Sequence, residues 1–197
     1  MVAELYGKFT GCAKGKAGSM HLIDLPAGVM GASAVVATTI PQAVGYALGL
    51  EMQNRNELVV CFLGDGACEE GVFHESMSYA ALRELPVLFV CENNSLAVHS
   101  KVDARQPFER IADFVKGYGI RTRHFPHMDF WELRAAFAEE IGRLRKERKG
   151  PAFVECRCFR WLEHVGPAED FNAGYRSRAE AEPWFERSEE HTSELQS

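Results

Sequence analysis

The sequence predicts an α/β fold with a doubly wound parallel sheet. Apolar runs of strand length alternate with segments of helical periodicity, and most of these runs are apolar on both faces. Strands of that kind are typical of a parallel sheet that is covered by helices on both sides. The chain has 197 residues, 46% of them hydrophobic, which is enough for one sizeable core. Residues 1–187 are therefore interpreted as one domain.

The first elements are predicted between residues 32 and 63. The run "ASAVVATTI" at 32–40 is rich in β-branched residues, and we expect it to be extended. "PQAVGYALGLEMQ" at 41–53 has helical spacing, and Pro41 suits a first helical turn because its missing N–H is not needed there. The continuous apolar run "LVVCFL" at 58–63 then predicts a buried strand.

The alternation of strands and helices continues to residue 159. "GVFHESMSYAALREL" at 71–85 has the apolar spacing of a helix, and "PVLFVCEN" at 86–93 is again a strand. The remaining elements are expected in the order helix 107–117, strand 119–124, helix 129–148 and strand 152–159.

Both ends of the chain differ from this pattern. The chain starts with a partial helix and the Gly/Lys-rich loop "GCAKGKAGSMH", so we expect a preceding segment to be missing. Residues 188–197, "SEEHTSELQS", have no apolar periodicity and are expected to be a disordered or foreign tail.

Composition excludes several classes of function. A net charge of −6 and a pI near 5.7 argue against binding to nucleic acid or to an anionic membrane, because such binding depends on clustered Lys and Arg. The basic run "RLRKERKG" at 143–150 is interpreted as a solvated helix end. No run approaches the ~18 apolar residues of a membrane span, and no signal peptide is recognisable. We expect a cytoplasmic protein.

The stretch "LGDGACEEG" at 63–71 is a glycine-rich turn directly after a predicted strand. Such a turn usually binds phosphate through backbone N–H groups, yet this one carries acidic side chains. A dinucleotide-binding fingerprint fails because Glu69 stands where its last glycine belongs. A P-loop fails as well, because its nearest candidate, "GCAKGKA", has the wrong spacing.

The acid in this turn predicts a metal ion. A carboxylate beside a diphosphate is repulsive unless a divalent cation lies between them, and Mg²⁺ prefers hard oxygen ligands. A second ligand is expected from the neighbouring strand end, where Asn93 and Asn94 follow Gly66 after 26 intervening residues. An amide oxygen and a backbone carbonyl just beyond it suit Mg²⁺.

The pattern formed by "GDG" and "NN", with 26 residues between them, resembles the thiamine-diphosphate motif. The surrounding sequence is similar to the alpha subunit of the thiamine-dependent 2-oxo acid dehydrogenases, which include the pyruvate, branched-chain and acetoin enzymes. The similarity runs from about Ala3 to about Trp184 and includes "GCAKGKAGSMH", "TTIPQAVGYALG" and "RWLEHVGP". It implies a doubly wound parallel sheet of the thiamine-diphosphate-binding type.

The resemblance implies a role for each residue of the motif. Asp65 and Asn94 would bind Mg²⁺ through their side chains and Leu96 through its backbone carbonyl, while Gly66 and Ala67 would donate N–H groups to the diphosphate.

Plainer roles are also open for the polar residues of the motif. Asp65 suits a helix N-cap, and Asn93 is interpreted as a turn residue that ends a strand. Glu69 and Glu70 are expected in the first turn of a helix, where negative charge is favourable.

Three further residues are assigned by the resemblance. Val36 matches the bulky side chain that separates the two rings of the bent cofactor, and Ala34 matches the backbone carbonyl that meets its aminopyrimidine. His164 matches the histidine of a loop that covers the active site, where an imidazole would bind the diphosphate or transfer a proton. Core packing is the alternative for Val36.

The resemblance implies oxidative decarboxylation of a 2-oxo acid, or cleavage of acetoin, with transfer of the acyl group to lipoamide. It also implies thiamine diphosphate and Mg²⁺ as cofactors, a beta subunit in an alpha2-beta2 assembly, and a lipoyl-bearing acyltransferase component as a partner. A family glutamate lies on the beta subunit and other site residues lie upstream, so we expect this chain alone to be inactive. Two alternatives to this function are open. The chain could be another thiamine-dependent transferase or synthase, or it could be a truncated non-catalytic fragment.

Overall fold

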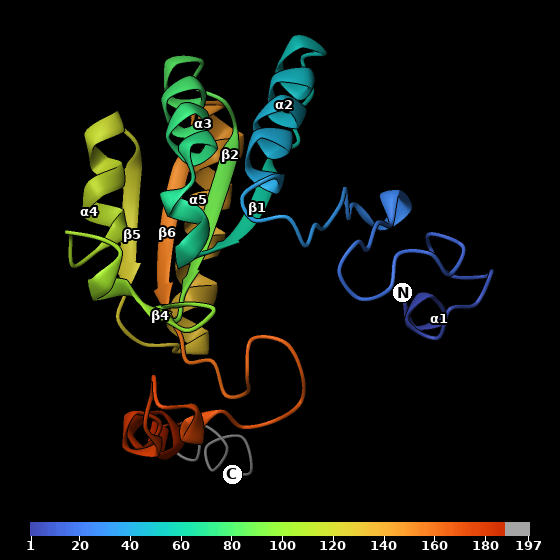
Figure 1. Ribbon diagram of the computed structural model, residues 1–197. Coiled ribbons are helices and arrows are strands. Elements are labelled where there is room, and N and C mark those ends of the chain that lie inside the picture. The colour runs from blue at the N-terminus through green and yellow to red at the C-terminus, as the bar shows by residue number, and fades with distance from the viewer. Residues whose placement is uncertain (188–197) are drawn as a thin grey trace.

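The computed structural model describes residues 1–187, so the predicted tail at 188–197 lies outside the described residues. Figure 1 shows a body of strands and helices, from which residues 1–38 extend to one side. Those residues include the short helix α1 (Val2–Leu5). Among residues 1–187, no helix has both the length and the apolar character that a membrane span requires.

The body is built on a four-stranded parallel sheet in the order β1-β2-β6-β5. The strands are β1 (Val59–Gly64), β2 (Val87–Asn93), β5 (Arg121–Phe125) and β6 (Ala152–Arg157). The two central strands, β2 and β6, are buried along most of their length, as their largely apolar sequences predict, and Glu155 is a buried charged residue within β6. A separate antiparallel hairpin joins β3 (Leu96–Ala97) to β4 (Ser100–Lys101).

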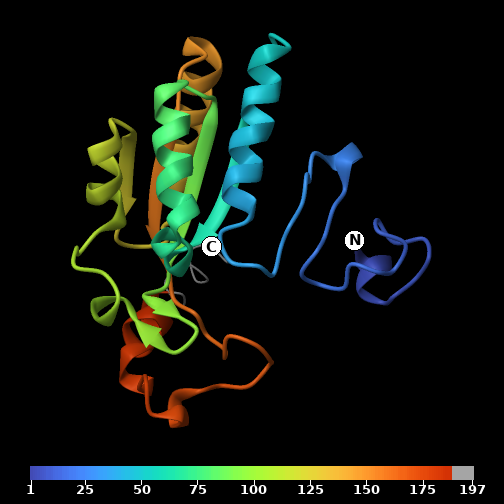
Figure 2. The same ribbon diagram turned by 45° about the horizontal axis from the view of Figure 1, so that its top comes forward.

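Helices cover both faces of this sheet, which confirms the doubly wound α/β prediction (Figures 1 and 2). The helices α2 (Thr39–Met52), α3 (Gly71–Leu82) and α4 (Ile111–Val115) pack on one face, in a core that includes Phe73. The long helix α5 (Phe130–Glu147) packs on the other face, where Leu144 is buried. The predicted helices and strands from residue 41 onward are all present, with ends that shift by a few residues.

The predicted strand at 32–40 is wrong. This segment forms a turn, and α2 already begins at Thr39. Ser33 Oγ accepts hydrogen bonds from the Val35 N–H at 3.1 Å and from Thr38 Oγ1 at 3.0 Å, and Ala37 has a φ of +63°. Hydroxyl groups that bind nearby backbone in this way favour turns over strands, and here they outweigh the β-branched composition.

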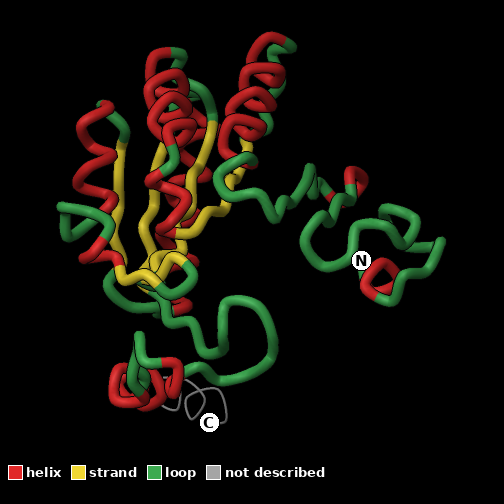
Figure 3. The backbone as a smooth tube through the Cα atoms, in the orientation of Figure 1, coloured by secondary structure: helices red, strands yellow, loops and turns green. Residues whose placement is uncertain are grey.

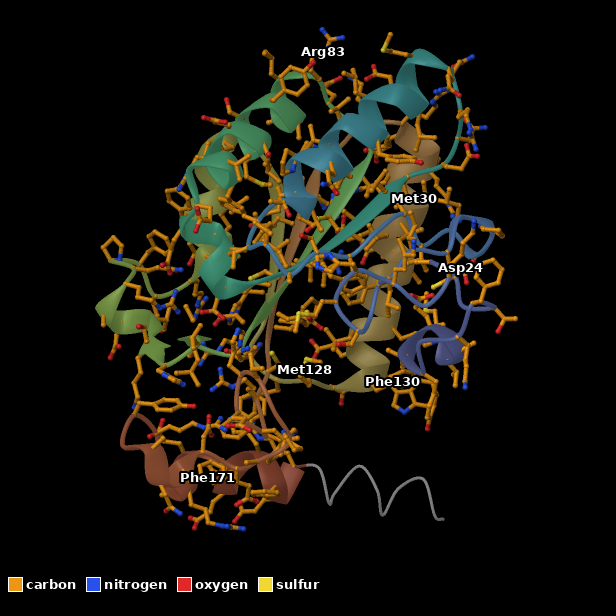
Figure 4. The ribbon with its side chains drawn as sticks, turned by 45° about the vertical axis from the view of Figure 1, so that its right-hand side comes forward. Asp24, Met30, Arg83, Met128, Phe130 and Phe171 are labelled. Atoms are coloured by element: carbon orange, nitrogen blue, oxygen red, sulfur yellow. The ribbon has the colours of Figure 1, made fainter. Side chains whose placement is uncertain are left out.

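The four strands end at the same edge of the sheet. Figure 3 shows the β3–β4 hairpin and the segment that follows β6 gathered beyond this edge. In Figure 4, Phe171 of that segment lies at the opposite end of the molecule from Arg83, which follows α3. The carboxyl edge of a parallel sheet is where ligands bind in doubly wound folds.

Removing the N-cap of α5 is expected to destabilise the protein moderately. Asp129 accepts a hydrogen bond from the Glu132 N–H at 2.8 Å, which pairs one of the helix's free amides. We expect Asp129→Ala to lower the free energy of unfolding by about 1 kcal/mol. Urea denaturation followed by circular dichroism measures this loss, and Asp129→Asn, which keeps an acceptor, should retain most of the stability. Equal losses in both variants would contradict the capping role.

Candidate functional site

The two halves of the predicted metal site lie on neighbouring strands. β1 and β2 are parallel and adjacent, with Gly64 paired to Glu92, so the turns after both strands lie at the same edge of the sheet. The turn after β1 is a 3₁₀ helix, Asp65–Glu69, and the segment after β2 leads through Asn94 into the β3–β4 hairpin. This adjacency is the one expected from the spacing of the motif.

Gly66 allows these two segments to touch. A Cβ atom built on Gly66 would lie 2.9 Å from the Cβ atom of Ala97, which is closer than two carbon atoms can approach without displacement. Glycine is therefore required for the turn to pack against the hairpin. As a result Gly66 lies close to the hairpin strand that begins at Leu96.

Asp65 is buried, and only one of its carboxylate oxygens is paired. Its side chain is 1% exposed, and Oδ2 accepts a hydrogen bond from Arg105 Nη2 at 2.6 Å. Oδ1 is buried and has no hydrogen-bond partner within residues 1–187. Burial raises the pKa of Asp65, while Arg105 and the Asn94 N–H oppose that rise. A buried oxygen left unpaired costs about 1–3 kcal/mol, which a bound cation would offset.

Asn94 and Leu96 are held in one tight turn. Asn94 Oδ1 accepts a hydrogen bond from the Leu96 N–H at 3.0 Å, and Ser95 between them has a φ of +65°. Side chains of Asn often form turns of this kind with the backbone two residues further on. The side-chain oxygen and the backbone carbonyl assigned to Mg²⁺ therefore belong to one short, fixed piece of chain.

Asn93 anchors the same turn to the sheet. Its Oδ1 accepts the Ser95 N–H at 2.9 Å, which confirms its interpretation as a turn residue that ends a strand. Its Nδ2 donates to Glu155 Oε1 on β6 at 2.6 Å, and Glu155 Oε2 accepts the Ala112 N–H at the start of α4 at 2.8 Å. This buried network, which was not predicted, fixes the end of β2 against its neighbours.

The residues present fit a magnesium ion. Within residues 1–187 no group of three or more His, Cys, Asp or Glu side chains is arranged to hold a metal. A metal here would use the free Asp65 oxygen, an amide oxygen and a backbone carbonyl, all of them hard ligands. Mg²⁺ commonly completes such a set with phosphate oxygens and water.

The predicted capping roles of the acidic residues are wrong. Gly64 stands at the N-cap of the 3₁₀ helix that Asp65 begins, so Asp65 is not an N-cap. Glu69 forms an ion pair with Arg105 and accepts a hydrogen bond from Gln106 Nε2 at 2.7 Å. Glu70 occupies the N-cap position of α3, but its side chain makes no capping hydrogen bond. The charge of Glu69 is paired with a guanidinium group and does not depend on the helix dipole.

Three assigned residues are exposed and take no part in the contacts described above. Ala34 and Val36 are exposed in the turn before α2, where Val36 is 59% exposed, so core packing of Val36 is wrong. His164 is exposed on the segment that follows β6. Within residues 1–187, no hydrogen bond or ion pair of His164 joins it to Asp65 or Arg105. Their roles toward a cofactor stay predictions.

Sequence reasoning missed Arg105 and Gln106. Arg105 pairs with Asp65 and Glu69, and Gln106 Nε2 lies 3.3 Å from the Asp65 carbonyl oxygen as well as bonding Glu69. The available signal was charge balance, because two acids in a buried turn require a nearby cation. The sequence does not say which of its 22 Lys and Arg residues supplies that cation.

Two surface hollows lie at the opposite edge of the sheet. One, of about 330 Å³, is lined by residues that include Leu58 and Pro86, which precede β1 and β2. The other, of about 500 Å³, includes Gly119 and Pro151, which precede β5 and β6. Neither hollow includes Asp65 or Asn94, and the amino edge of a parallel sheet is not its usual binding edge.

Comparison with known proteins gives consistent matches. The family model described as dehydrogenase E1 component matches residues 1–192. The chain is 37% identical over 174 residues to the alpha subunit of acetoin:2,6-dichlorophenolindophenol oxidoreductase from Cupriavidus necator, covering 88% of the chain and 52% of that protein. It is 35% identical over 189 residues to the pyruvate dehydrogenase E1 component subunit alpha of Rickettsia felis, covering 95% and 56% respectively. The chain thus spans about half the length of these relatives.

A solved structure supports the fold. An X-ray structure from Mycobacterium smegmatis, of a protein described as a thiamin diphosphate-dependent enzyme, superposes with a TM-score of 0.52. It is 24% identical, and the match covers 67% of this chain and 24% of that one. The parallel sheet is therefore of the type found in thiamine-dependent enzymes.

Proposed function

The chain belongs to the dehydrogenase E1 component family, and from this premise we propose that it is a thiamine-diphosphate- and Mg²⁺-dependent alpha subunit. Its reaction is the oxidative decarboxylation of a 2-oxo acid such as pyruvate, or the cleavage of acetoin, with transfer of the acyl group to lipoamide. Relatives named for acetoin and for pyruvate both support this reaction class.

The free oxygen of Asp65 is the observation that supports the proposal most directly. A buried carboxylate oxygen without a partner, at the carboxyl edge of a parallel sheet, is suited to a cation. In this proposal Asp65 and Asn94 bind Mg²⁺ through their side chains, and Leu96 binds it through its carbonyl. Gly66 and Ala67 donate backbone N–H groups to the diphosphate, which their place in a 3₁₀ turn makes possible.

Three residues outside the metal cluster have roles toward the organic part of the cofactor and the substrate. When bound, thiamine diphosphate supplies the electron sink that decarboxylation requires. Val36 and Ala34 hold the cofactor in its bent form, and their exposure leaves them accessible to it. His164 hydrogen-bonds the diphosphate or transfers a proton, and its exposed imidazole is accessible for either role.

We also propose the partners of this subunit. It works with a beta subunit in an alpha2-beta2 assembly, and it passes its acyl group to a lipoyl-bearing acyltransferase component. The names of the relatives, which are alpha subunits, support a beta partner. A cytoplasmic location stays a prediction.

Calorimetric titration with thiamine diphosphate tests the proposal. The chain, with its beta subunit, is titrated in the presence of Mg²⁺ and again in the presence of a chelator. We expect binding that requires the metal, because the diphosphate and Asp65 repel each other without it. Absence of metal-dependent binding would show a non-catalytic fragment and overturn the proposal.

Assays with pyruvate, branched 2-oxo acids and acetoin then identify the substrate, and a different acceptor would indicate a thiamine-dependent transferase or synthase.

A further inference from the structure

Arg105 is a largely buried cation at the centre of the candidate metal site. Its side chain is 10% exposed, and its guanidinium group contacts both acids of the turn after β1. Nη2 donates to Asp65 Oδ2 at 2.6 Å, and Nη1 donates to Glu69. Two carboxylates share one cation, so the cluster keeps a net negative charge.

The guanidinium group is also fixed from its other side. Nε donates to the carbonyl oxygen of Ser100 at 3.1 Å and to that of Lys101 at 3.2 Å. Both carbonyls belong to β4, so all three nitrogen atoms of the group have partners within the protein. A planar group with several donors in fixed directions restrains its partners more strongly than a single ammonium charge does.

These bonds connect the two halves of the metal site. β4 pairs with β3, and Lys101 lies directly opposite Leu96, whose carbonyl is a proposed ligand. Arg105 therefore links Asp65 to Lys101, and the hairpin pairing links Lys101 to Leu96. The loop closes on itself as well, because the Val102 N–H donates to the Ser95 carbonyl at 2.9 Å.

We propose that Arg105 is a positioning residue for the metal site, which holds Asp65 through Oδ2 so that Oδ1 is left for the divalent cation. This inference rests on the proposed function, because it assigns Arg105 a role in the same magnesium site. It goes beyond the ligand set, since Arg105 does not touch the metal and acts by fixing Asp65 relative to the hairpin. Partners that orient a ligand in this way typically change metal affinity by about 10–100-fold.

Charge repulsion by Arg105 would have the opposite effect on metal affinity. Coulomb repulsion between Arg105 and a bound cation would weaken metal binding, so removal of Arg105 would then strengthen it. Glu69 reduces this repulsion because it is paired with the same guanidinium group. Without Arg105, the cluster would hold two acids with no shared cation, and Asp65 would lose the one side chain among residues 1–187 that donates a hydrogen bond to its Oδ2. We therefore expect the loss of positioning to dominate.

Mn²⁺ binding, measured by electron paramagnetic resonance in the presence of thiamine diphosphate, distinguishes the two effects. The full chain with its beta subunit is compared with Arg105→Gln, which removes the charge, and with Arg105→Lys, which keeps it. We expect Arg105→Gln to weaken Mn²⁺ binding about 10–100-fold. Arg105→Lys should give an intermediate affinity, because one ammonium group cannot reach all the partners. A purely structural role would show no such partial rescue in metal affinity.

Arg143→Gln is the matched control. Arg143 also contacts two acids, Glu140 and Glu147, and its side chain is 17% exposed, but its partners belong to α5 on the far face of the sheet. Its replacement should leave Mn²⁺ affinity unchanged. An unchanged or higher affinity in folded Arg105→Gln would overturn the inference. If Arg105→Gln fails to fold, Arg105→Lys serves as the test: weaker Mn²⁺ binding supports the inference, and unchanged or higher affinity overturns it. Absence of Mn²⁺ binding in the unaltered chain would instead overturn the proposed function.

Discussion

Replacement of Asp65 by alanine is expected to abolish magnesium-dependent binding of thiamine diphosphate. Asp65 provides the one charged ligand of the proposed set, and its free oxygen is already buried and directed by Arg105. Orienting partners alone change metal affinity by about 10–100-fold, so loss of the ligand itself should weaken binding by more than about 100-fold. Calorimetric titration with thiamine diphosphate and Mg²⁺ measures the loss.

Two further variants make this result specific. Asp65→Asn keeps the shape and one oxygen but loses the charge, so we expect it to bind more weakly than the original chain and to fold normally. Asp113→Ala removes an exposed acid of α4 whose partner is Lys116, and it should bind as the original chain does. Unchanged affinity in folded Asp65→Ala would show that the metal ligand has been assigned wrongly.

The second large effect is expected at Asp170, in the segment after β6. Asp170 Oδ1 accepts a hydrogen bond from Arg176 Nε at 2.5 Å, and Oδ2 accepts one from Arg160 Nη2 at 3.0 Å. Arg176 is 2% exposed and lies over the rings of Phe159 and Phe171. Asp170→Ala would leave this guanidinium buried without its carboxylate.

We expect Asp170→Ala to reduce the stability of residues 159–181 by about 3–5 kcal/mol, because a buried charge loses its partner. Native-state hydrogen exchange of that segment measures the change. Glu169→Ala is the neighbouring control, since Glu169 and Arg178 form an exposed ion pair whose loss should cost less than about 1 kcal/mol. Similar exchange in the two variants would contradict the importance of the buried pair.

The same pair predicts the effect of acid on this segment. Although burial disfavours the carboxylate, hydrogen bonds and charge from Arg176 and Arg160 lower the pKa of Asp170 below its ordinary value. A carboxyl whose pKa is lowered on folding stabilises the folded state above its unfolded pKa, about 3.9, and that contribution is lost as the pH falls through its folded pKa. Protection from exchange should therefore persist at pH 5 and decline below about pH 4, and Asp170→Ala should lack this decline.

Most of the fold was predictable because its elements carry strong local signals. Largely apolar runs identify β1, β2 and β6, and the acidic start and basic end of α5 identify its limits. The turn at 33–38 was not predictable from composition, because hydrogen bonds of Ser33 and Thr38 determine it and β-branched residues suggest a strand. Local side-chain hydrogen bonds of this kind offer the backbone an alternative to the extended conformation.

The candidate site was predictable where it depends on topology. The adjacency of Asp65 and Asn94 follows from two parallel strands joined by one helix, and their spacing contains that information. The partners of Glu69 and Asp65 were not predictable, because Arg105 reaches them from 36 and 40 residues away along the chain. No periodicity or motif records a contact of that kind.

The strand order has a consequence for the synthesis of the chain. β6, at residues 152–157, lies between β2 and β5, although both are made earlier. While the chain leaves the ribosome, β1 and β2 can pair as soon as both have emerged, but β5 has no neighbour until β6 follows it. Until β6 forms, the newly made protein therefore carries the β1–β2 pair and a separate unpaired β5, both with open strand edges, and β6 then joins them.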